Sequence, residues 1–469
     1  MARLVRNPAG SFSGDPPLGS RVAASGALAI SLVTIAGLAA ATAQNVLFVF
    51  GTLVIVALSI SALWIAATNS RYRVVAVLAA PVFLGAELAI LVVQGRHILT
   101  MLLGLLGVFV AWGLGTLALH WEVQQALRAR WKTVAPTSRG VVIMNPKSGG
   151  GKVERFALAQ EAYRRGVEAV LLEPGDDLRS LAESAVQHGA DALGMAGGDG
   201  SQAIVAAVAK AHGLPFVCVP AGTRNHFALD LGIDRNHPAR ALDAFGEAKE
   251  SSIDLGEVNG EIFVNNVSLG LYAKIVASDQ YRNAKRRTVA EMLPGLIGPA
   301  ASPSDFTTAG PDGPIDDAQI ILVSNNPYRL ASLSGFGSRP SLDSGRLGVV
   351  AITITRASDV HRIVALEVAG HPERYEKWRD WTTSELVVNG PPSLAVGIDG
   401  EAATLASPLH FTIHQAALRV RIAPGESGAS PAFRRTPIGA STLSGLWRVV
   451  RGRPSGMVGA IHLPIETAP

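Results

Sequence analysis

Three short segments rich in glycine and small polar residues have the composition of phosphate-binding loops. Glycine lets backbone N–H groups approach a phosphate closely, and the N-terminus of a following helix adds partial positive charge. The first loop is not a Walker A motif, because that pattern requires Gly at Pro146 and Ser or Thr at Val153. The three loops are, in chain order, Asn145-Pro146-Lys147-Ser148-Gly149, Gly197-Gly198-Asp199-Gly200-Ser201 and Pro220-Ala221-Gly222-Thr223-Arg224-Asn225.

Each loop follows an apolar run that is typical of a buried strand. Alternation of such runs with amphipathic helical stretches over residues 139–250 predicts a parallel sheet covered by helices. The three loops would then share the carboxyl edge of the sheet, where open α/β sheets bind ligands. One such loop alone could equally be a plain tight turn, but three at one edge predict a phosphate site. The predicted strands are 141–144, 169–172, 192–196 and 215–219, and the predicted helices are 153–165, 178–188 and 202–212.

Residues 251–424 have a different pattern, which predicts an antiparallel β-sandwich. Asn259-Gly260 between two apolar runs, 253–258 and 261–269, is typical of a hairpin with a type I′ turn. Further strands are predicted at 319–323, 347–355, 384–388, 394–398 and 409–420, with helical insertions at 277–293 and 358–369. Residues 425–469 are rich in Gly, Pro, Ser and Arg and predict a flexible basic tail, either solvated or touching anionic lipid.

Four long apolar runs precede these two halves. Each has 20 to 22 residues, which at about 1.5 Å per residue spans the roughly 30 Å core of a bilayer. They predict a transmembrane region over 22–120, after a short N-terminus at 1–21. A cleaved signal peptide ending at 41–43 is the alternative for the first run, which is however longer than a signal core of about 7–15 residues. The runs are 22–43, 46–67, 74–93 and 98–119.

The distribution of charge predicts the orientation of this region. Residues 1–139 carry ten basic and three acidic side chains (+7), whereas the rest carry 31 and 34 (−3). The basic residues flank the predicted spans on one side, so the positive-inside rule places the interfacial linker 121–138 and the body after it in the cytoplasm. Glu87, inside the third run, either packs against hydroxyl groups of neighbouring spans or takes part in lipid or proton handling.

The overall composition limits the classes of partner. Of the 469 residues, 48% are hydrophobic and 17% are charged, against about 25% charged in a typical soluble protein. The net charge of +4 is too small to indicate a nucleic-acid surface, so no nucleic-acid partner is expected. Cys218 is the only cysteine, which excludes a disulfide within the chain. The sequence does not set an oligomeric state.

In combination, the three loops resemble the superfamily of diacylglycerol and sphingosine kinases. The resemblance continues through Ile253-Asp254-Leu255-Gly256, Phe263-Val264-Asn265-Asn266-Val267-Ser268-Leu269-Gly270 and Asp399-Gly400-Glu401, and it covers roughly residues 139–423. It implies an α/β nucleotide-binding domain followed by a β-sandwich lipid-binding domain, with ATP between them. That agrees with the two halves inferred from the pattern alone.

The resemblance also implies roles for individual residues. Glu401 would be the general base that acts on a lipid hydroxyl, with Asp399 beside it, and Asp254 would belong to a polar network around the phosphoryl group and Mg²⁺. Phosphoryl transfer requires an aligned hydroxyl, neutralised phosphate oxygens and a carboxylate near the proton. Without the resemblance, Asp399 and Glu401 would be read as a turn between two strands. The residues implied to bind ATP are Asn145, Pro146, Lys147, Ser148, Gly149, Gly197, Gly198, Asp199, Gly200, Ser201, Thr223 and Asn225.

The sequence departs from the family pattern at four places. Ser201 replaces the usual Thr and keeps its hydroxyl group, whereas Ala203-Ile204 replaces an Asn-Glu pair. His226 stands where an acid is usual, and is either a titrating group near the site or a packed or solvent-facing side chain. Ser344 replaces the Asp of a metal-binding loop, which leaves Asp343 as the candidate ligand there.

These observations predict a membrane-anchored lipid kinase that uses ATP and Mg²⁺. Diacylglycerol is the expected acceptor, with phosphatidic acid as its product, and the expected partners are a membrane lipid and the bilayer. A sphingoid base, ceramide or a polyprenol could also present the hydroxyl group. Two other classes stay open: a non-catalytic nucleotide or lipid sensor, and a kinase of a soluble metabolite, since NAD kinases have a similar Gly-Gly-Asp-Gly loop.

Overall fold

The computed structural model describes residues 15–42, 98–270, 306–328, 337–354, 374–434 and 440–456, with a few isolated positions besides. The chain divides into two compact units, residues 1–126 with 436–459, and residues 127–435 with 460–469. The described residues do not include Glu87, the third predicted span or the predicted helix 277–293. They also leave out nearly all of the second span and of the predicted helix 358–369.

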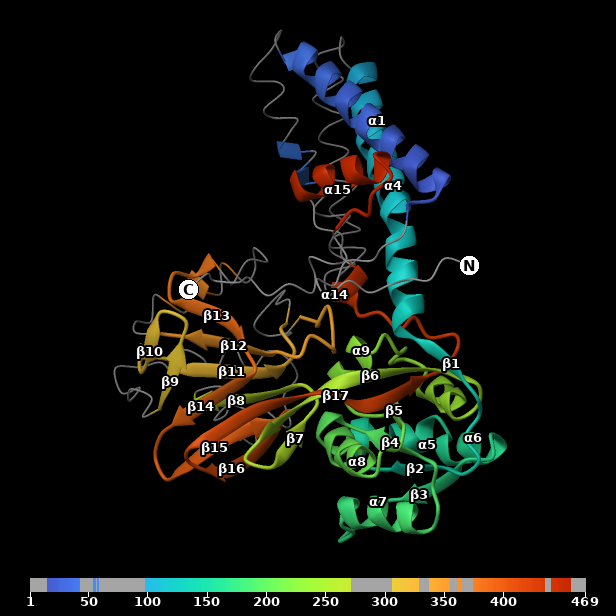
Figure 1. The fold of residues 1–469 in the computed structure, drawn as a ribbon, viewed down its shortest axis with the longest axis vertical. Coiled ribbons are helices and arrows are strands. Elements are labelled where there is room, and N and C mark those ends of the chain that lie inside the picture. The colour runs from blue at the N-terminus through green and yellow to red at the C-terminus, as the bar shows by residue number, and fades with distance from the viewer. Residues whose placement is uncertain are drawn as a thin grey trace. The chain divides into compact units, whose positions relative to one another are not determined.

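A four-stranded parallel sheet lies at one end of the larger unit (Figure 1). Its spatial order is β3-β2-β4-β5, and every neighbouring pair is parallel. Strands β2, β4 and β5 are buried along their whole length. This confirms the predicted α/β half. The strands are β2 (Gly140–Met144), β3 (Glu168–Leu171), β4 (Ala192–Gly197) and β5 (Phe216–Pro220).

Helices between these strands complete the α/β layer. They are α5 (Lys152–Arg155), α6 (Leu158–Arg164), α7 (Leu178–Gln187) and α8 (Asp199–Ala211). The predicted helix 153–165 is in fact two helices, because Ala157 has a positive φ of 49° that ends the first. Asp177 begins α7 as a cap, accepting a hydrogen bond of 2.8 Å from the backbone N–H of Ser180.

Two long strands join the halves of this unit. Strand β6 (Ala248–Val258) pairs antiparallel with β17 (Leu409–Ile422), and the end of β17 lies parallel to β5. A bulge interrupts the β6–β17 pairing between His414 and Leu418. The predicted domain boundary at residue 250 therefore falls inside β6, and the α/β sheet continues into the second half.

The second half is an antiparallel sandwich, as predicted. One layer is the far part of the large sheet, with β7 (Glu261–Phe263), β9 (Thr307–Gly310), β10 (Gly313–Ile315) and β14 (Glu385–Asn389). The other is a six-stranded sheet of β13 (Trp378–Thr383), β12 (Leu347–Ile352), β11 (Ile320–Asn325), β8 (Asn266–Gly270), β15 (Ser393–Ile398) and β16 (Glu401–Ala406), in that order.

The core of the sandwich explains why its strands alternate in polarity. Phe263 and Phe411 meet edge to face in it, with ring centroids 6.5 Å apart. The predicted strand 261–269 is wrong in one respect, because the chain breaks at Val264-Asn265 and passes from one sheet to the other. Core members from both layers include Val258, Phe263, Val267, Leu269, Ile321, Val323, Leu386, Val388, Leu394, Val396, Leu409 and Phe411.

The prediction of a flexible tail from residue 425 is wrong for the described part of that segment. It contains α14 (Pro431–Arg434) and α15 (Ala440–Val450). The Trp131 indole N–H donates to the Gly428 carbonyl at 2.9 Å, and Phe433 is buried. Composition indicated a loop because the partner surfaces of these residues are far away in the sequence.

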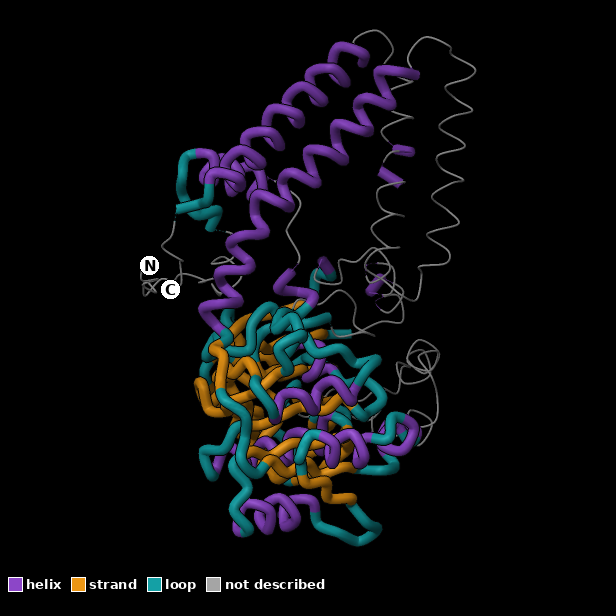
Figure 2. The backbone as a smooth tube through the Cα atoms, turned by 90° about the vertical axis from the view of Figure 1, so that its right-hand side faces the viewer, coloured by secondary structure: helices purple, strands orange, loops and turns teal. Residues whose placement is uncertain are grey.

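In the smaller unit, α1 (Leu18–Thr42) and α4 (Ile98–Arg130) lie side by side (Figure 2). Their stretches Leu18–Gly37 and Leu102–Arg130 are long and apolar enough to cross a membrane. Buried alanines such as Ala24 and Ala118 let the helices approach, and Leu446 and Val449 of α15 pack against them. Four spans were predicted, and the structure supports two of them as helices of that length.

Candidate active site

The first and second loops meet where the order of the parallel strands reverses. From β2 the chain crosses to β3 on one side and returns to β4 on the other side of β2. The loops after β2 and β4 therefore flank the topological switch point, where open α/β sheets bind their ligands. The sequence predicted that these loops share one edge of the sheet. The strand order shows that they lie next to each other because β2 and β4 are neighbours.

The three loops touch through their glycines. A Cβ atom added to Gly222 would lie 2.5 Å from the Cα of Gly198, and one added to Gly149 would overlap the carbonyl oxygen of Ala221. The Ser148 hydroxyl lies 3.8 Å from the Cβ position of Gly198. No larger residue fits at Gly222 or Gly149 without moving the backbone, so the loops converge as predicted.

Asn225 shapes the third loop from inside. It is 3% exposed and has a positive φ of 52°. Its Oδ1 accepts from the Gly222 N–H at 2.8 Å, and its Nδ2 donates to the Gly222 carbonyl at 2.8 Å. Thr223, by contrast, is exposed at the rim of the same loop. The buried amide of Asn225 is thus engaged by the loop itself.

Gln202 was not predicted as part of the site. It is 1% exposed, and its Nε2 donates to the carbonyls of Met195 at 2.9 Å and Val219 at 3.0 Å. It therefore ties together the ends of β4 and β5 beneath the second and third loops. A polar amide among the apolar residues of α8 is the sequence signal that could have identified it.

The carboxylate of Asp199 joins the second loop to α9 (His226–Asp230). Its Oδ2 accepts from the His226 N–H at 3.0 Å, and its Oδ1 accepts from the Phe227 N–H at 3.1 Å. Both oxygens thus hold the first turn of the helix that follows the third loop. Each oxygen keeps a further lone pair, so these bonds do not exclude another ligand.

Lys152 brings a cation to the loops and was missed in the sequence. Its ammonium group donates to the Gly222 carbonyl at 2.9 Å. Burial, followed by the positive charges of Arg155 and Arg235, lowers its pKa. Lys147, inside the first loop, is exposed instead.

Glu401 reaches this edge from the other half of the unit. Asp399 and Gly400, with φ values of 49° and 85°, form the two-residue turn between β15 and β16, and Ile398 pairs with Glu401. A Cβ atom added to Gly200 would lie 2.5 Å from Oε1 of Glu401. The carboxylate therefore rests against the first turn of α8, in the second loop.

Asp399 supports the hairpin beside Glu401. Its carboxylate accepts hydrogen bonds from the backbone N–H groups of Val264 at 2.9 Å, Asn265 at 2.7 Å and Asn266 at 3.1 Å. Burial raises its pKa to about 7, and the three N–H bonds oppose that rise. These contacts hold the hairpin to the break between β7 and β8.

Asp254 lies in the middle of β6 and is 1% exposed. Its Oδ2 accepts from the Gly345 N–H at 2.7 Å, and its Oδ1 accepts from the Ala416 N–H at 2.8 Å in the β17 bulge. Burial raises its pKa, and these bonds oppose the rise. Asp343 accepts a hydrogen bond from the Ser341 hydroxyl. No group of three or more His, Cys, Asp or Glu is placed to hold a metal within the described ranges.

His226 is a packed side chain rather than a group that titrates near neutral pH. Burial lowers its pKa to about 4, although Asp199 opposes the shift. Its Nδ1 is buried and has no hydrogen-bond partner among the residues that the structure describes. The imidazole is therefore neutral at pH 7.

Comparison with known proteins agrees with this geometry. The family model described as the diacylglycerol kinase catalytic domain matches residues 139–258. A protein of Pseudomonas aeruginosa named "Probable lipid kinase YegS-like" is 37% identical over 306 residues, which is 63% of this chain and 97% of that protein.

Two proteins named diacylglycerol kinase are also similar. The one from Bacillus subtilis is 31% identical over 279 residues, or 56% of this chain and 89% of that protein. The one from Mycobacterium tuberculosis is 34% identical over 124 residues, or 25% and 40% of the two chains. The chain therefore belongs to the diacylglycerol kinase superfamily of lipid kinases, and it is an ATP-dependent lipid kinase.

Proposed function

We propose that this protein is a membrane-anchored kinase that transfers the γ-phosphoryl group of ATP to the hydroxyl group of diacylglycerol, giving phosphatidic acid. The observation that carries the proposal is the contact of Glu401 with Gly200, which brings a carboxylate of the sandwich to the second loop. The names of the Bacillus and Mycobacterium relatives support diacylglycerol as the acceptor.

Backbone groups and one lysine would hold the phosphates. All three loops, including Thr223 in the third, offer backbone N–H groups and hydroxyl groups. Helix α8 is 13 residues long and begins in the second loop, so its N-terminus would add partial positive charge. Lys152 adds a cation. The body after residue 139 has a net charge of −3, so its overall charge does not attract ATP. Asn225, whose amide is engaged by the third loop, would shape the nucleotide site rather than contact ATP.

The acidic residues fit an Mg²⁺–ATP complex in part. Asp199 is the acid at the second loop and retains lone pairs on both oxygens, so it would contact the ion. Asp254 binds the β17 bulge and would order that region, and Asp343 lies near it. Mg²⁺ supplies neutralisation of the phosphate oxygens. Asp343 remains a proposed metal ligand.

Glu401 would accept the proton of the lipid hydroxyl as its oxygen attacks the γ-phosphorus. The residue lies at the start of β16 on an exposed hairpin, which leaves the carboxylate accessible to a substrate. Asp399 would hold this hairpin in place through its three N–H bonds, instead of touching the reacting atoms. General-base catalysis of this kind contributes about 10²–10⁴-fold in rate.

The apolar helices of the smaller unit would anchor the kinase to the membrane that contains its substrate. The stretches Leu18–Gly37 and Leu102–Arg130, of 20 and 29 residues, reach the length of about 20 residues that a bilayer core requires. The excess of basic residues in 1–139 would keep the catalytic body in the cytoplasm, where ATP is present.

An acceptor panel tests the proposal. The purified full-length chain is incubated with labelled ATP, Mg²⁺ and mixed micelles that contain diacylglycerol, sphingosine, ceramide or a polyprenol, or with NAD in solution. We expect label in phosphatidic acid. Label in another lipid would overturn the acceptor, label only in NADP would favour a soluble-metabolite kinase, and ATP binding without turnover would favour a sensor.

A further inference from the structure

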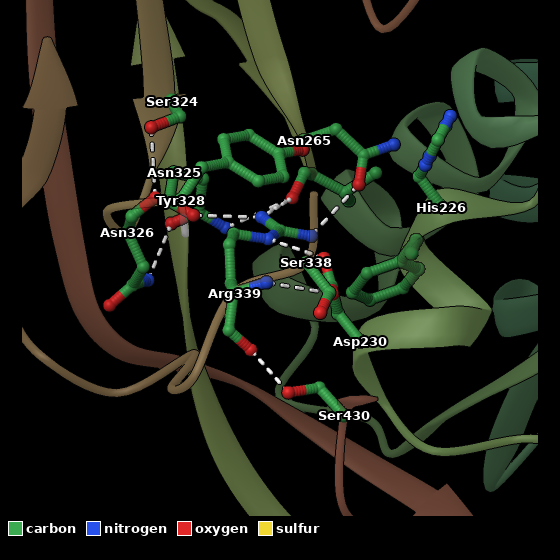
Figure 3. Close-up of polar contacts among 12 residues, drawn as sticks. His226, Asp230, Asn265, Ser324, Asn325, Asn326, Tyr328, Ser338, Arg339 and Ser430 are labelled. Atoms are coloured by element: carbon green, nitrogen blue, oxygen red, sulfur yellow. Dashed lines mark hydrogen bonds and ion pairs between the residues drawn. The ribbon is translucent and has the colours of Figure 1, made fainter. Parts of the chain in front are cut away.

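One arginine is completely buried where the two halves of the larger unit meet. Arg339 has an exposed fraction of 0%, and its ion-pair partner Asp230 is equally hidden, with an Nε–Oδ2 distance of 2.6 Å (Figure 3). Burying two charges costs more than their attraction returns unless every hydrogen-bonding group is satisfied. A side chain of this kind therefore needs an explanation beyond stability.

All three nitrogen atoms of the guanidinium group donate hydrogen bonds. Its Nη1 donates to the carbonyls of Val264 at 2.6 Å and Asn325 at 2.7 Å, and its Nη2 donates to Oδ1 of Asn265 at 2.8 Å. The ring of Tyr328 lies 5.3 Å from the guanidinium carbon. The Asp230 charge holds the pKa of Arg339 above its usual value although burial alone would lower it.

Arg339 and Asp399 both form hydrogen bonds with the break between β7 and β8. Arg339 binds the Val264 carbonyl and the Asn265 side chain, while Asp399 accepts the backbone N–H groups of Val264, Asn265 and Asn266. Asp399 is the first residue of the two-residue turn that carries Glu401. The guanidinium group thus acts on the hairpin through one intervening turn.

The other end of the network leads back to the second loop. Asp230 is the last residue of α9, and the first turn of α9 is held by the carboxylate of Asp199. Asp199 directly precedes Gly200, against which Glu401 rests. The contacts therefore form a closed circuit: Asp199, α9, Asp230, Arg339, the 264–266 turn, Asp399, Glu401 and Gly200.

We propose that Arg339 is a positioning residue for phosphoryl transfer, which sets Glu401 against the second loop by fixing α9 and the 264–266 turn relative to each other. This inference rests on the proposed role of Glu401. Arginine suits the task because its planar group donates in several fixed directions, whereas lysine offers one small charged group. An Arg339→Lys change keeps the positive charge but loses the hydrogen bonds that the guanidinium group donates in fixed directions.

The test compares Arg339→Lys with a matched control, Arg379→Lys. Arg379 makes a bidentate pair with Asp317 at 3.0 and 3.1 Å on the surface of the same sandwich, so the control makes the same substitution in an exposed Arg–Asp pair outside the circuit. We measure kcat and KM for ATP and for diacylglycerol in micelles, together with the melting temperature. We expect kcat of Arg339→Lys to fall about 10- to 100-fold with KM for ATP within twofold, and Arg379→Lys to match the wild type.

A double-mutant cycle with Glu401→Gln separates positioning from general stability. If Arg339 acts through Glu401, adding Arg339→Lys to Glu401→Gln lowers the residual rate less than twofold. Equal losses in both backgrounds, or a lower melting temperature with kcat unchanged, would overturn the inference. Asn265→Ala, which removes one contact of Nη2 and leaves the ion pair, repeats the test if Arg339→Lys fails to fold.

The same data show which claim fails. Full activity of Glu401→Gln would contradict the proposed function itself. A strongly reduced but measurable rate of Glu401→Gln, combined with independent, additive losses from Arg339→Lys, would leave the proposed function standing and reject only the role of Arg339.

Discussion

The contact between Glu401 and Gly200 links the two halves of the larger unit at the proposed active site. The carboxylate lies where any side chain at residue 200 would have to be. Because the clash involves the movable end of Glu401 and not backbone, the fold should accommodate a methyl group there while the carboxylate moves away. If Glu401 has its proposed role, a side chain at residue 200 should therefore affect catalysis more than stability.

Gly200→Ala should lower kcat for lipid phosphorylation at least about tenfold and leave the free energy of unfolding unchanged or slightly higher, since Ala favours helix by about 1 kcal/mol. Steady-state kinetics and chemical denaturation measure the two effects. Gly425→Ala is the control, because its Cβ position has no heavy atom within 4 Å. Wild-type kinetics in Gly200→Ala would show that Glu401 does not need this position.

The lowered pKa of His226 predicts that the stability of the folded protein decreases as the pH falls. Its pKa is about 4 in the folded protein, below the ordinary value of 6.5. Between these values the unfolded chain binds more protons, so stability is full above about pH 6.5 and falls as the pH drops toward 4, by up to about 3 kcal/mol. His226→Gln should reduce the slope of unfolding free energy against pH in this window. Parallel curves for the two proteins would refute the assignment.

The sequence predicted that the three loops gather at one edge, whereas the role of each residue stays a prediction. Asp399, Asp199 and Asn225 were expected beside the reaction, and the structure adds that each also hydrogen-bonds to backbone groups. Their partners lie in segments remote along the chain, which no local pattern reveals. The turn at Asp399-Gly400 was open to prediction, since Asp-Gly between alternating apolar residues is a strong hairpin signal.

At the scale of elements, hydrophobic periodicity located most strands. It failed where a side chain remote in the sequence determines where a strand ends. Residues 261–269 read as one strand because apolar residues continue through Val264. The break into β7 and β8 is stabilised by the carboxylate of Asp399, far along the chain. The same limit applies to the tail, where apolar residues scattered among Gly and Ser find partners in distant elements.

Phe433 tests whether the tail is part of the folded body. It is 4% exposed in α14, so Phe433→Ala should destabilise the protein by about 3–5 kcal/mol. Leu171→Ala is the control, because Leu171 is 48% exposed and should cost less than about 1 kcal/mol. Denaturant unfolding measures both changes. Equal, small losses of stability in both variants would support the flexible tail that composition predicted.

At the scale of the whole molecule, the high apolar fraction divides between a helical front and an ordinary core. The two described helices that satisfy the length requirement support an anchor, and the runs 46–67 and 74–93 stay predictions. Charge divides in the same way, with the excess of basic residues in 1–139 and a body close to neutrality.

The full-length chain should therefore stay in the membrane pellet after extraction with alkaline carbonate and require detergent for release. Apolar helices of this length bury their side chains in lipid, which high pH does not reverse. Immunoblots of pellet and supernatant, with a peripheral protein of the same cells as control, measure the outcome. Release by carbonate would contradict a transmembrane anchor.

The most direct test of the central claim is phosphoryl transfer by Glu401→Gln. Glutamine keeps the size of the side chain against Gly200 and removes its ability to take a proton. We predict that kcat for diacylglycerol falls about 10²–10⁴-fold while ATP binds as tightly as to the wild type. Phosphatidic acid formed at the wild-type rate would contradict the account.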